Sequence, residues 1–157
     1  MAYIQLLSPA LTEASRRQLE EVAALDRAHS PVMRSANRYA SFLGDGGTVV
    51  LATGGPALQG FAAMSAVLDE GTLLNIVVAP HARRSGVATA LLNAVIADAR
   101  RQSLRRLLLE AREGNRAALA LYREAGFRRD TLRPRYYPAR DGQPAEAAVL
   151  MSLSLEN

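Results

Sequence analysis

The chain has 157 residues, of which 49% are hydrophobic, and this length and composition fit a single domain over residues 1–157 with a core of its own. It contains no cysteine and only two histidines, His29 and His81, which excludes disulfides, thiolate metal sites and a cysteine nucleophile and predicts no metal centre. No signal-type segment opens the sequence and no apolar run approaches the roughly 20 residues of a membrane span, so we expect a cytoplasmic protein without membrane association.

The basic residues are unevenly distributed. All 19 are arginine, and the net charge is +4. Residues 83–140 contain 14 arginines and five acidic residues, a balance of +9, whereas the rest of the chain contains five arginines and ten acidic residues, a balance of −5. This asymmetry favours a small polyanionic ligand bound beside an amine substrate, with no direct nucleic-acid contact expected. A monomer or weak dimer is expected.

The N-terminal half predicts two helices and a run of strands. Thr12 caps a predicted helix that continues to about residue 28, and a shorter helix is expected over residues 33–42. Strands are expected over residues 2–7, 48–53, 58–68 and 72–78, and the glycine-rich turns between them predict an antiparallel meander. The apolar density of residues 72–78 is typical of a central strand that is covered on both faces.

The C-terminal half predicts a change to alternating helices and strands. A helix over residues 84–101 followed by a strand over residues 105–110 completes a βαβ unit with a right-handed crossover. Asn115 caps a further helix that Gly126 ends, and strands over residues 127–132 and 147–153 finish the sheet. The predicted fold class is α/β, with a mixed, mostly antiparallel sheet of six or seven strands and helices on both faces.

The turn from Arg83 to Ala88 is the strongest functional signal. An apolar strand ends before Pro80, and a basic turn that contains Gly86 leads into a helix, which directs several backbone N–H groups toward one point. Gly86 lets an anion approach the backbone, while Arg83 and Arg84 add positive charge. The spacing matches neither a dinucleotide fingerprint nor a P-loop. We interpret the segment as a diphosphate-binding turn; the alternative is an ordinary connection between a strand and a helix.

Several further motifs follow this turn in a fixed order, and together they resemble the GNAT family of acetyl-CoA-dependent N-acetyltransferases. The motifs that carry the resemblance are Val78-Ala79-Pro80, Arg83 to Ala88, Leu109-Glu110, Asn115 to Ala118, Leu121-Tyr122, Gly126-Phe127 and Arg135 to Pro138. The resemblance covers about residues 58–153 and is greatest to the RimI branch, which acetylates the N-terminal alanine of a small-subunit ribosomal protein. It implies a GNAT fold with a central splayed strand pair, acetyl-CoA as co-substrate, and a protein N-terminus as acceptor.

The resemblance also implies roles for individual residues. Glu110 would be the general base and Tyr122 the general acid, because an α-amine with a pKa of about 8 must lose a proton and the departing thiolate must gain one. The implied cofactor-binding residues are Ile76, Val77, Val78, Arg83, Arg84, Ser85, Gly86, Val87, Ala88, Thr89 and Asn115. The expected substrate-binding residues are Glu70, Asn75, Tyr136 and Tyr137. The alternative for Glu70 is a solvated carboxylate, and the alternative for Tyr136 and Tyr137 is packing within a hairpin. Two alternatives are that Glu110 pairs with Arg112 and that Tyr122 is only a core tyrosine.

Two departures from the branch pattern concern the acceptor. The sequence His29-Ser30-Pro31-Val32-Met33 stands where the branch has an aromatic-Pro-Trp element, and Ala147 follows Glu146 where the branch has an acidic pair. The expected activity is direct acetyl transfer to a protein N-terminal alanine. Acetylation of a lysine side chain or a small amine is one alternative, and acyl-CoA binding without catalysis is another.

Overall fold

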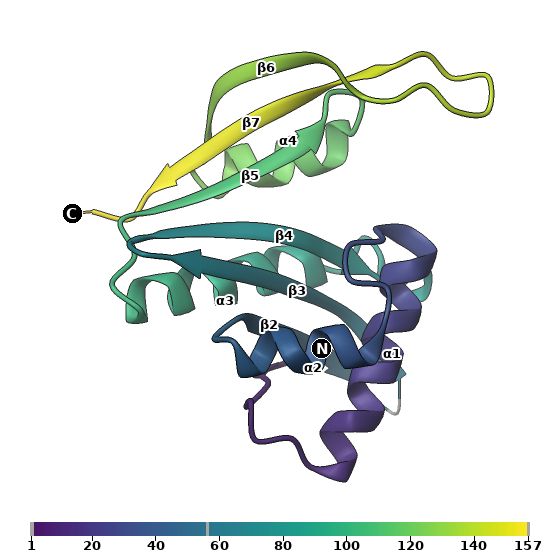
Figure 1. The fold of residues 1–157 in the computed structure, drawn as a ribbon, viewed down its shortest axis with the longest axis vertical. Helices are drawn as coiled ribbons and strands as arrows, with labels where there is room; N and C mark the ends of the chain where they lie inside the picture. Colours follow the sequence, from purple (N-terminus) through teal and green to yellow (C-terminus); the bar gives the residue numbers. More distant parts are fainter. Residues whose placement is uncertain (1, 56, 157) are drawn as a thin grey trace.

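The computed structural model describes residues 2–55 and 57–156 and shows one seven-stranded sheet with the order β1-β2-β3-β4-β5-β7-β6 (Figure 1). Neighbouring strands are antiparallel except for β4 and β5, which are parallel. The strands are β1 (Tyr3–Leu6), β2 (Thr48–Gly54), β3 (Ala57–Val67), β4 (Glu70–Val78), β5 (Arg106–Arg112), β6 (Arg128–Tyr137) and β7 (Glu146–Ser154). The helices are α1 (Glu13–His29), α2 (Ala36–Gly44), α3 (Val87–Arg101) and α4 (Arg116–Glu124), with a 3-10 turn η1 (Pro80–Ala82).

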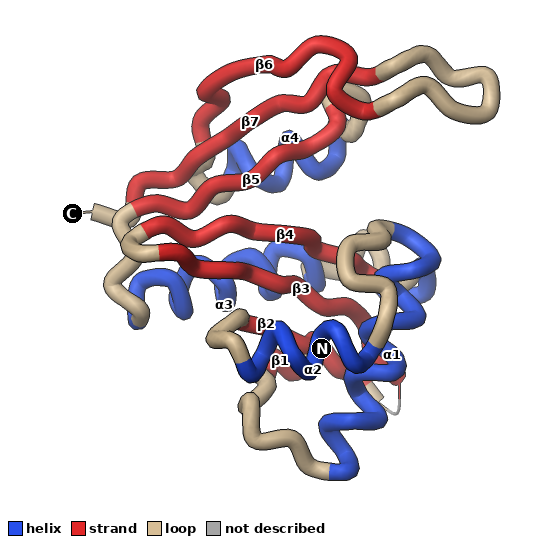
Figure 2. Tube along the Cα trace, viewed as in Figure 1, coloured by secondary structure: helices blue, strands red, loops and turns tan. Residues whose placement is uncertain are grey.

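Helices cover both faces of this sheet, and each face has its own core (Figure 2). Helices α3 and α4 pack on one face, where Leu91, Val95 and Leu107 are fully buried. Helices α1 and α2 pack on the other, where Tyr39 and Phe61 meet edge to face with their ring centroids 5.7 Å apart. The predicted α/β fold class is confirmed.

The N-terminal helices begin at side-chain caps. Thr12 accepts a hydrogen bond from the N–H of Ser15 at 3.1 Å, which confirms the predicted start of α1. Ser35 caps α2 in the same way through the N–H of Arg38 at 3.2 Å. The prediction that this second helix begins at Met33 was therefore wrong by three residues.

The parallel strands β4 and β5 are joined only at one end. They share three residue pairs, the last of which is between Thr72 and Leu108. One residue further along, β4 contains a bulge, since Leu73 and Asn75 lie opposite successive residues of β3 and Leu74 is extra. From there the two strands diverge (Figure 1). The splayed central pair is thus present, and it leaves a gap between the two halves of the sheet.

Candidate active site

A cavity of about 1130 Å³ opens at the gap between β4 and β5. Both strands line it, together with the turn before α3, helix α4, the segment after α1 and the β6–β7 hairpin. It brings together most of the predicted site residues: Asn75, Ile76, Val77, Val78, Arg83, Arg84, Gly86, Val87, Ala88, Thr89, Glu110, Asn115, Tyr122 and Tyr137. Glu70, Ser85 and Tyr136 do not line it.

Two predicted substrate-binding residues lie elsewhere. Glu70 is at the start of β4 and pairs with Arg106, with 2.6 Å between Oε2 and Nη2. Eight residues of extended strand, about 26 Å, separate it from Val78 at the cavity end. The structure therefore does not bring Glu70 to the cavity with the other predicted site residues, and its carboxylate lies instead at the paired end of β4 and β5. Tyr136 is 44% exposed and packs edge to face on Tyr137 outside the cavity.

The turn before α3 presents a row of backbone donors. Arg84 and Gly86 have positive φ angles of 60° and 81°, and such a conformation curves successive N–H groups around one point. Within residues 2–55 and 57–156, no acceptor receives a backbone N–H from residues 84–89; Ala90 is the first to bond, to the carbonyl of Gly86 at 3.1 Å. The prediction that the helix begins at Arg84 was wrong, because these φ angles delay it to Val87.

Strand β4 presents backbone groups to the gap at alternate residues. The N–H of Ala79 donates to a β3 carbonyl at 2.7 Å, so Ala79 faces β3. Because successive residues of a strand direct their backbone groups to opposite sides, Val77 also faces β3, whereas Ile76 and Val78 face the gap. The carbonyl of Val78 accepts a hydrogen bond from Nε of Arg83 at 3.2 Å. Of the three predicted residues, two therefore offer backbone groups to a ligand.

Glu110 lies on β5 beyond the last pair with β4, and its side chain faces the cavity as an exposed carboxylate. It forms no ion pair within the part of the chain that the structure describes. Arg112, its alternative partner, instead pairs with Glu146 at 3.2 Å and lies over the ring of Tyr137, 4.1 Å from the centroid. The alternative of a Glu110–Arg112 pair is thus wrong.

Tyr122 lines the same cavity from α4. Its ring is 6% exposed and packs against Phe127 with the centroids 5.9 Å apart. Burial, and then the neighbouring Tyr137, raise the pKa of Tyr122 to about 12. The hydroxyl therefore keeps its proton at neutral pH, and it makes no hydrogen bond to the described residues.

The ends of α4 are fixed as the sequence predicts. The side chain of Asn115 accepts a hydrogen bond from the N–H of Ala118 at 3.2 Å, so its carbonyl oxygen is the cap, and Asn115 is one of the residues that line the cavity. Gly126 follows the helix with φ of 105°, and the next N–H returns to the carbonyl of Tyr122 at 3.0 Å. Both caps help to place Tyr122.

Sequence reasoning missed a cluster that holds the β6–β7 hairpin beside β5. Glu146 accepts the N–H of Gly114 at 2.8 Å and pairs with Arg112, whose guanidinium lies over Tyr137. The Gly114 N–H, with Arg112 as a second cause, lowers the pKa of Glu146 below its ordinary value. The carboxylate is thus ionised at neutral pH, and the cluster keeps Tyr137 at the cavity.

A second missed group is Asp26 with Tyr39. Asp26 is fully buried in α1 and holds the segment after that helix through several hydrogen bonds. The sequence did contain a signal, because Asp26 continues the helical spacing of the buried residues Leu19, Val22 and Ala23. An acidic residue on an apolar helix face requires buried partners.

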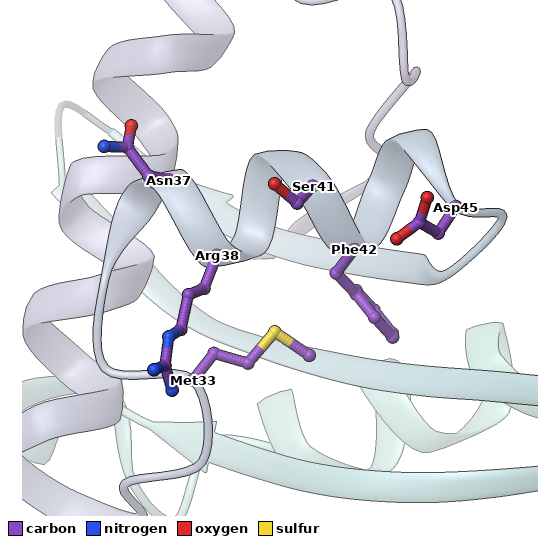
Figure 3. Close-up of a pocket in the computed structure, with 6 residues that line it drawn as sticks. All are labelled: Met33, Asn37, Arg38, Ser41, Phe42 and Asp45. Atoms are coloured by element: carbon purple, nitrogen blue, oxygen red, sulfur yellow. The ribbon is translucent and has the colours of Figure 1, made fainter.

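A smaller hollow of about 420 Å³ lies beside α2 (Figure 3). It is lined by Met33, Asn37, Arg38, Ser41, Phe42 and Asp45. It contains none of the predicted site residues and is separate from the cavity at the strand gap. We assign no ligand to it.

Neither a metal site nor a membrane-spanning helix is found in the described ranges. No group of three or more His, Asp or Glu side chains in residues 2–55 and 57–156 is placed to hold a metal ion. Among the helices described, none combines the length and the apolar character needed to cross a bilayer.

Comparison with known proteins identifies the class to which this fold and site belong. The Acetyltransferase (GNAT) family profile matches residues 6–127, and the chain belongs to this family. The ribosomal protein bS18-alanine N-acetyltransferase of Escherichia coli (strain K12) is 42% identical over 98 residues, which are 62% of this chain and 65% of that protein. The protein of the same name from Haemophilus influenzae is 37% identical over 91 residues, 58% of this chain and 62% of that one. These matches span just under two-thirds of each relative.

Solved structures extend the similarity over nearly the whole chain. The crystal structure of the ribosomal-protein-S18-alanine N-acetyltransferase from Escherichia coli aligns with a TM-score of 0.80 and 32% identity, covering 99% of this chain and 96% of that one. The structure of yncA from Salmonella typhimurium with its cofactor acetyl-CoA has a TM-score of 0.80 but 16% identity, and supports the fold alone. The predicted resemblance to the family and to its RimI branch is confirmed.

Proposed function

We propose that this chain is an acetyl-CoA-dependent N-acetyltransferase that modifies a protein N-terminus beginning with alanine, of the ribosomal protein bS18 type. One observation carries the proposal. The unpartnered N–H groups of residues 84 and 86–89, the open backbone of β4, and the side chains of Glu110 and Tyr122 all line one cavity. The names of the curated relatives supply the acceptor.

The residues of the cavity fit acetyl-CoA. Its pyrophosphate is anionic, and the N–H groups at the positive end of α3, with Arg83 and Arg84, offer donors and charge that match it. Its pantetheine amides complement the backbone groups of Ile76 and Val78. Bound acetyl-CoA supplies the acetyl group as an activated thioester. Asn115 lines the same cavity, and the helix cap uses only its carbonyl oxygen.

The two polar side chains at the gap have complementary tasks. Glu110 takes a proton from the acceptor ammonium, directly or through water, because an α-amine has a pKa of about 8 and attacks only when neutral. Tyr122 retains its proton at neutral pH and donates it toward the departing sulfur. The chain has no cysteine, and the hydroxyl of Ser85 donates to the carbonyl of Ala82 at 2.5 Å. These facts favour direct transfer within a ternary complex.

A peptide comparison tests the acceptor. The wild-type protein is given acetyl-CoA with an alanine-terminated peptide, an N-blocked lysine peptide or a polyamine, and free thiol is measured. The chain has no cysteine, so a thiol reagent reports only released CoA. We expect the alanine-terminated peptide to react fastest. Preference for the lysine peptide or polyamine would contradict the N-terminal acceptor, and acetyl-CoA binding without turnover on any acceptor would indicate a non-catalytic module.

Replacing Gly86 with alanine tests the turn before α3. An added Cβ meets no heavy atom within 4 Å, so the change acts through the positive φ of 81°, which costs an L-residue about 1 kcal/mol. We expect acetyl-CoA affinity, measured by calorimetric titration, to fall about tenfold, because the N–H groups of the turn no longer point toward one site. Gly46→Ala is the matched control, because Gly46 has φ of 95° and equally open surroundings but lies outside the cavity. Equal affinity of both variants would contradict the role of this turn.

A further inference from the structure

The segment between α1 and α2 is held by a buried carboxylate. Asp26 accepts hydrogen bonds from the N–H groups of Val32, Met33 and Arg34 at 3.0–3.2 Å. It also accepts the hydroxyl of Tyr39, whose pKa is raised by burial and by this bond, so the proton stays on the tyrosine. Asp26 thereby fixes three consecutive backbone groups and one core side chain.

Asn75 of β4 joins the same network with only 6% of its surface exposed. Its Nδ2 donates to the carbonyl of Ser30 and to the hydroxyl oxygen of Tyr39, both at 3.3 Å. Because the Tyr39 proton goes to Asp26, the Tyr39 oxygen can only accept from Asn75, and this fixes which way the amide faces. The Oδ1 atom is left buried and without a partner among the described residues.

An amide is an unfavourable choice here if Asn75 serves only as a core residue. A buried carbonyl without a hydrogen bond destabilises the fold, and a leucine of similar size would avoid that loss. What the amide provides is the bond to Ser30. Ser30, Pro31 and Val32 line the cavity, so this bond ties part of the cavity wall to the strand that borders the gap.

This wall and the turn before α3 belong to opposite faces of the sheet. Asn75 and Val77 direct their side chains to the face that carries α1 and α2, whereas Ile76 and Val78 pack with the core on the α3 face. The cavity therefore passes through the gap. With the thioester ligand held from the α3 face, the opening between Ser30–Val32 and the hairpin residues Tyr137 and Arg140 is left for the acceptor. In Figure 1 this hairpin and the α1–α2 segment lie at the same end of the sheet.

We propose that Asn75 is a positioning residue for the acceptor substrate. Through its bond to Ser30, and braced by Tyr39 and Asp26, it holds the wall against which the acceptor N-terminus lies. This inference depends on the proposed N-acetyltransferase function for its kinetic consequences, but the brace itself is a property of the protein without ligand.

Asn75→Leu tests the proposal, because it keeps the side-chain size while removing both N–H donors and the unpaired carbonyl. We expect the KM for the alanine-terminated peptide to rise about tenfold, the effect of losing one or two hydrogen bonds, with the KM for acetyl-CoA unchanged. Tyr39→Phe, which keeps the ring in the core, is expected to shift the same KM in the same direction by a smaller factor. A residue with only a structural role would change the unfolding temperature and leave the acceptor KM unaltered.

Thr48→Val is the matched control. Thr48 donates to the buried carboxylate of Asp98 at 2.8 Å, in a network of similar burial that lies outside the cavity. This variant is expected to lose stability without a change in either KM. An unchanged acceptor KM in Asn75→Leu, or an equal rise in both KM values, would overturn the proposal.

A readout without substrate separates this proposal from the proposed function. Hydrogen exchange at the N–H groups of Val32, Met33 and Arg34 is expected to be faster in Asn75→Leu than in the wild type and in Thr48→Val, because the segment has lost its hydrogen bond to β4. Unchanged exchange would refute the brace even if the enzyme is active. If the wild type acetylates no N-terminal peptide, the proposed function fails while the exchange result still decides whether Asn75 holds this segment.

Discussion

Glu110→Gln is expected to lower kcat for an alanine-terminated peptide about 100- to 1000-fold, with acetyl-CoA affinity unchanged. Glutamine keeps the shape of the side chain but cannot take the proton of the acceptor ammonium. Glu110 has no ion pair within the described ranges, so the substitution breaks no salt bridge that we observe there. The measurement is steady-state thiol release, with acetyl-CoA binding followed separately by titration.

The pH dependence of this variant gives a sharper test. Above about pH 8 the α-amine is largely neutral in solution, so the need for a protein base declines. The ratio of the wild-type kcat to the kcat of Glu110→Gln is therefore expected to decrease between pH 7 and pH 9.5. Glu113→Gln, an exposed carboxylate three residues away that does not line the cavity, is the control and should behave as wild type. A ratio that stays constant with pH would argue against proton abstraction by Glu110.

Tyr122→Phe is expected to lower kcat about 100-fold, through loss of the proton donor to the departing thiolate. The folded protein should remain as stable as wild type, because the hydroxyl has no hydrogen-bond partner among the described residues and the ring keeps its contact with Phe127. Kinetics at saturating acetyl-CoA and a thermal melt measure the two quantities. Tyr136→Phe, at an exposed ring outside the cavity, is the control.

The raised pKa of Tyr122 also predicts how activity should depend on pH. An ordinary tyrosine ionises near pH 10, but this one does so at about 12 in the folded protein. The acid therefore stays protonated over the usual assay range, and no activity loss between pH 7 and pH 10 should depend on Tyr122. A decrease in activity between pH 7 and pH 10 that is absent in Tyr122→Phe would contradict the raised pKa of Tyr122.

Signals that act within a few residues could be predicted from the sequence. Thr12 and Asn115 cap their helices, and Gly126 ends α4 with a positive φ, all as expected. The order of the motifs also predicted which strands and helices would meet, because a βαβ crossover places the turn before α3 beside the ends of the two parallel strands.

Features that depend on distant contacts could not be predicted in the same way. The start of α2 is delayed because Arg34 has a positive φ angle of 67°, which excludes it from a helix, in a segment whose N–H groups are bound by Asp26. The role of Asp26 is visible only after folding. Glu70 was predicted to bind the substrate, but the parallel register sets it beside Arg106 at the end of β4 opposite to Val78. For the candidate site, the sequence predicted half of the residues that line the cavity and missed the buried groups that hold its walls.

The gap beside β4 leaves an unpaired strand edge inside the molecule. Such edges normally attract other strands and promote aggregation, but this one lines the cavity, and Arg83 already donates a hydrogen bond to the carbonyl of Val78. A ligand arm that forms hydrogen bonds with the edge of β4 is recognised in the way an added strand would be. The recognised groups are the amides of the arm and not the acyl group at its end. The main chain of β4 consequently does not discriminate between acyl groups. Selection among thioesters depends on the side chains around the acyl end of the arm.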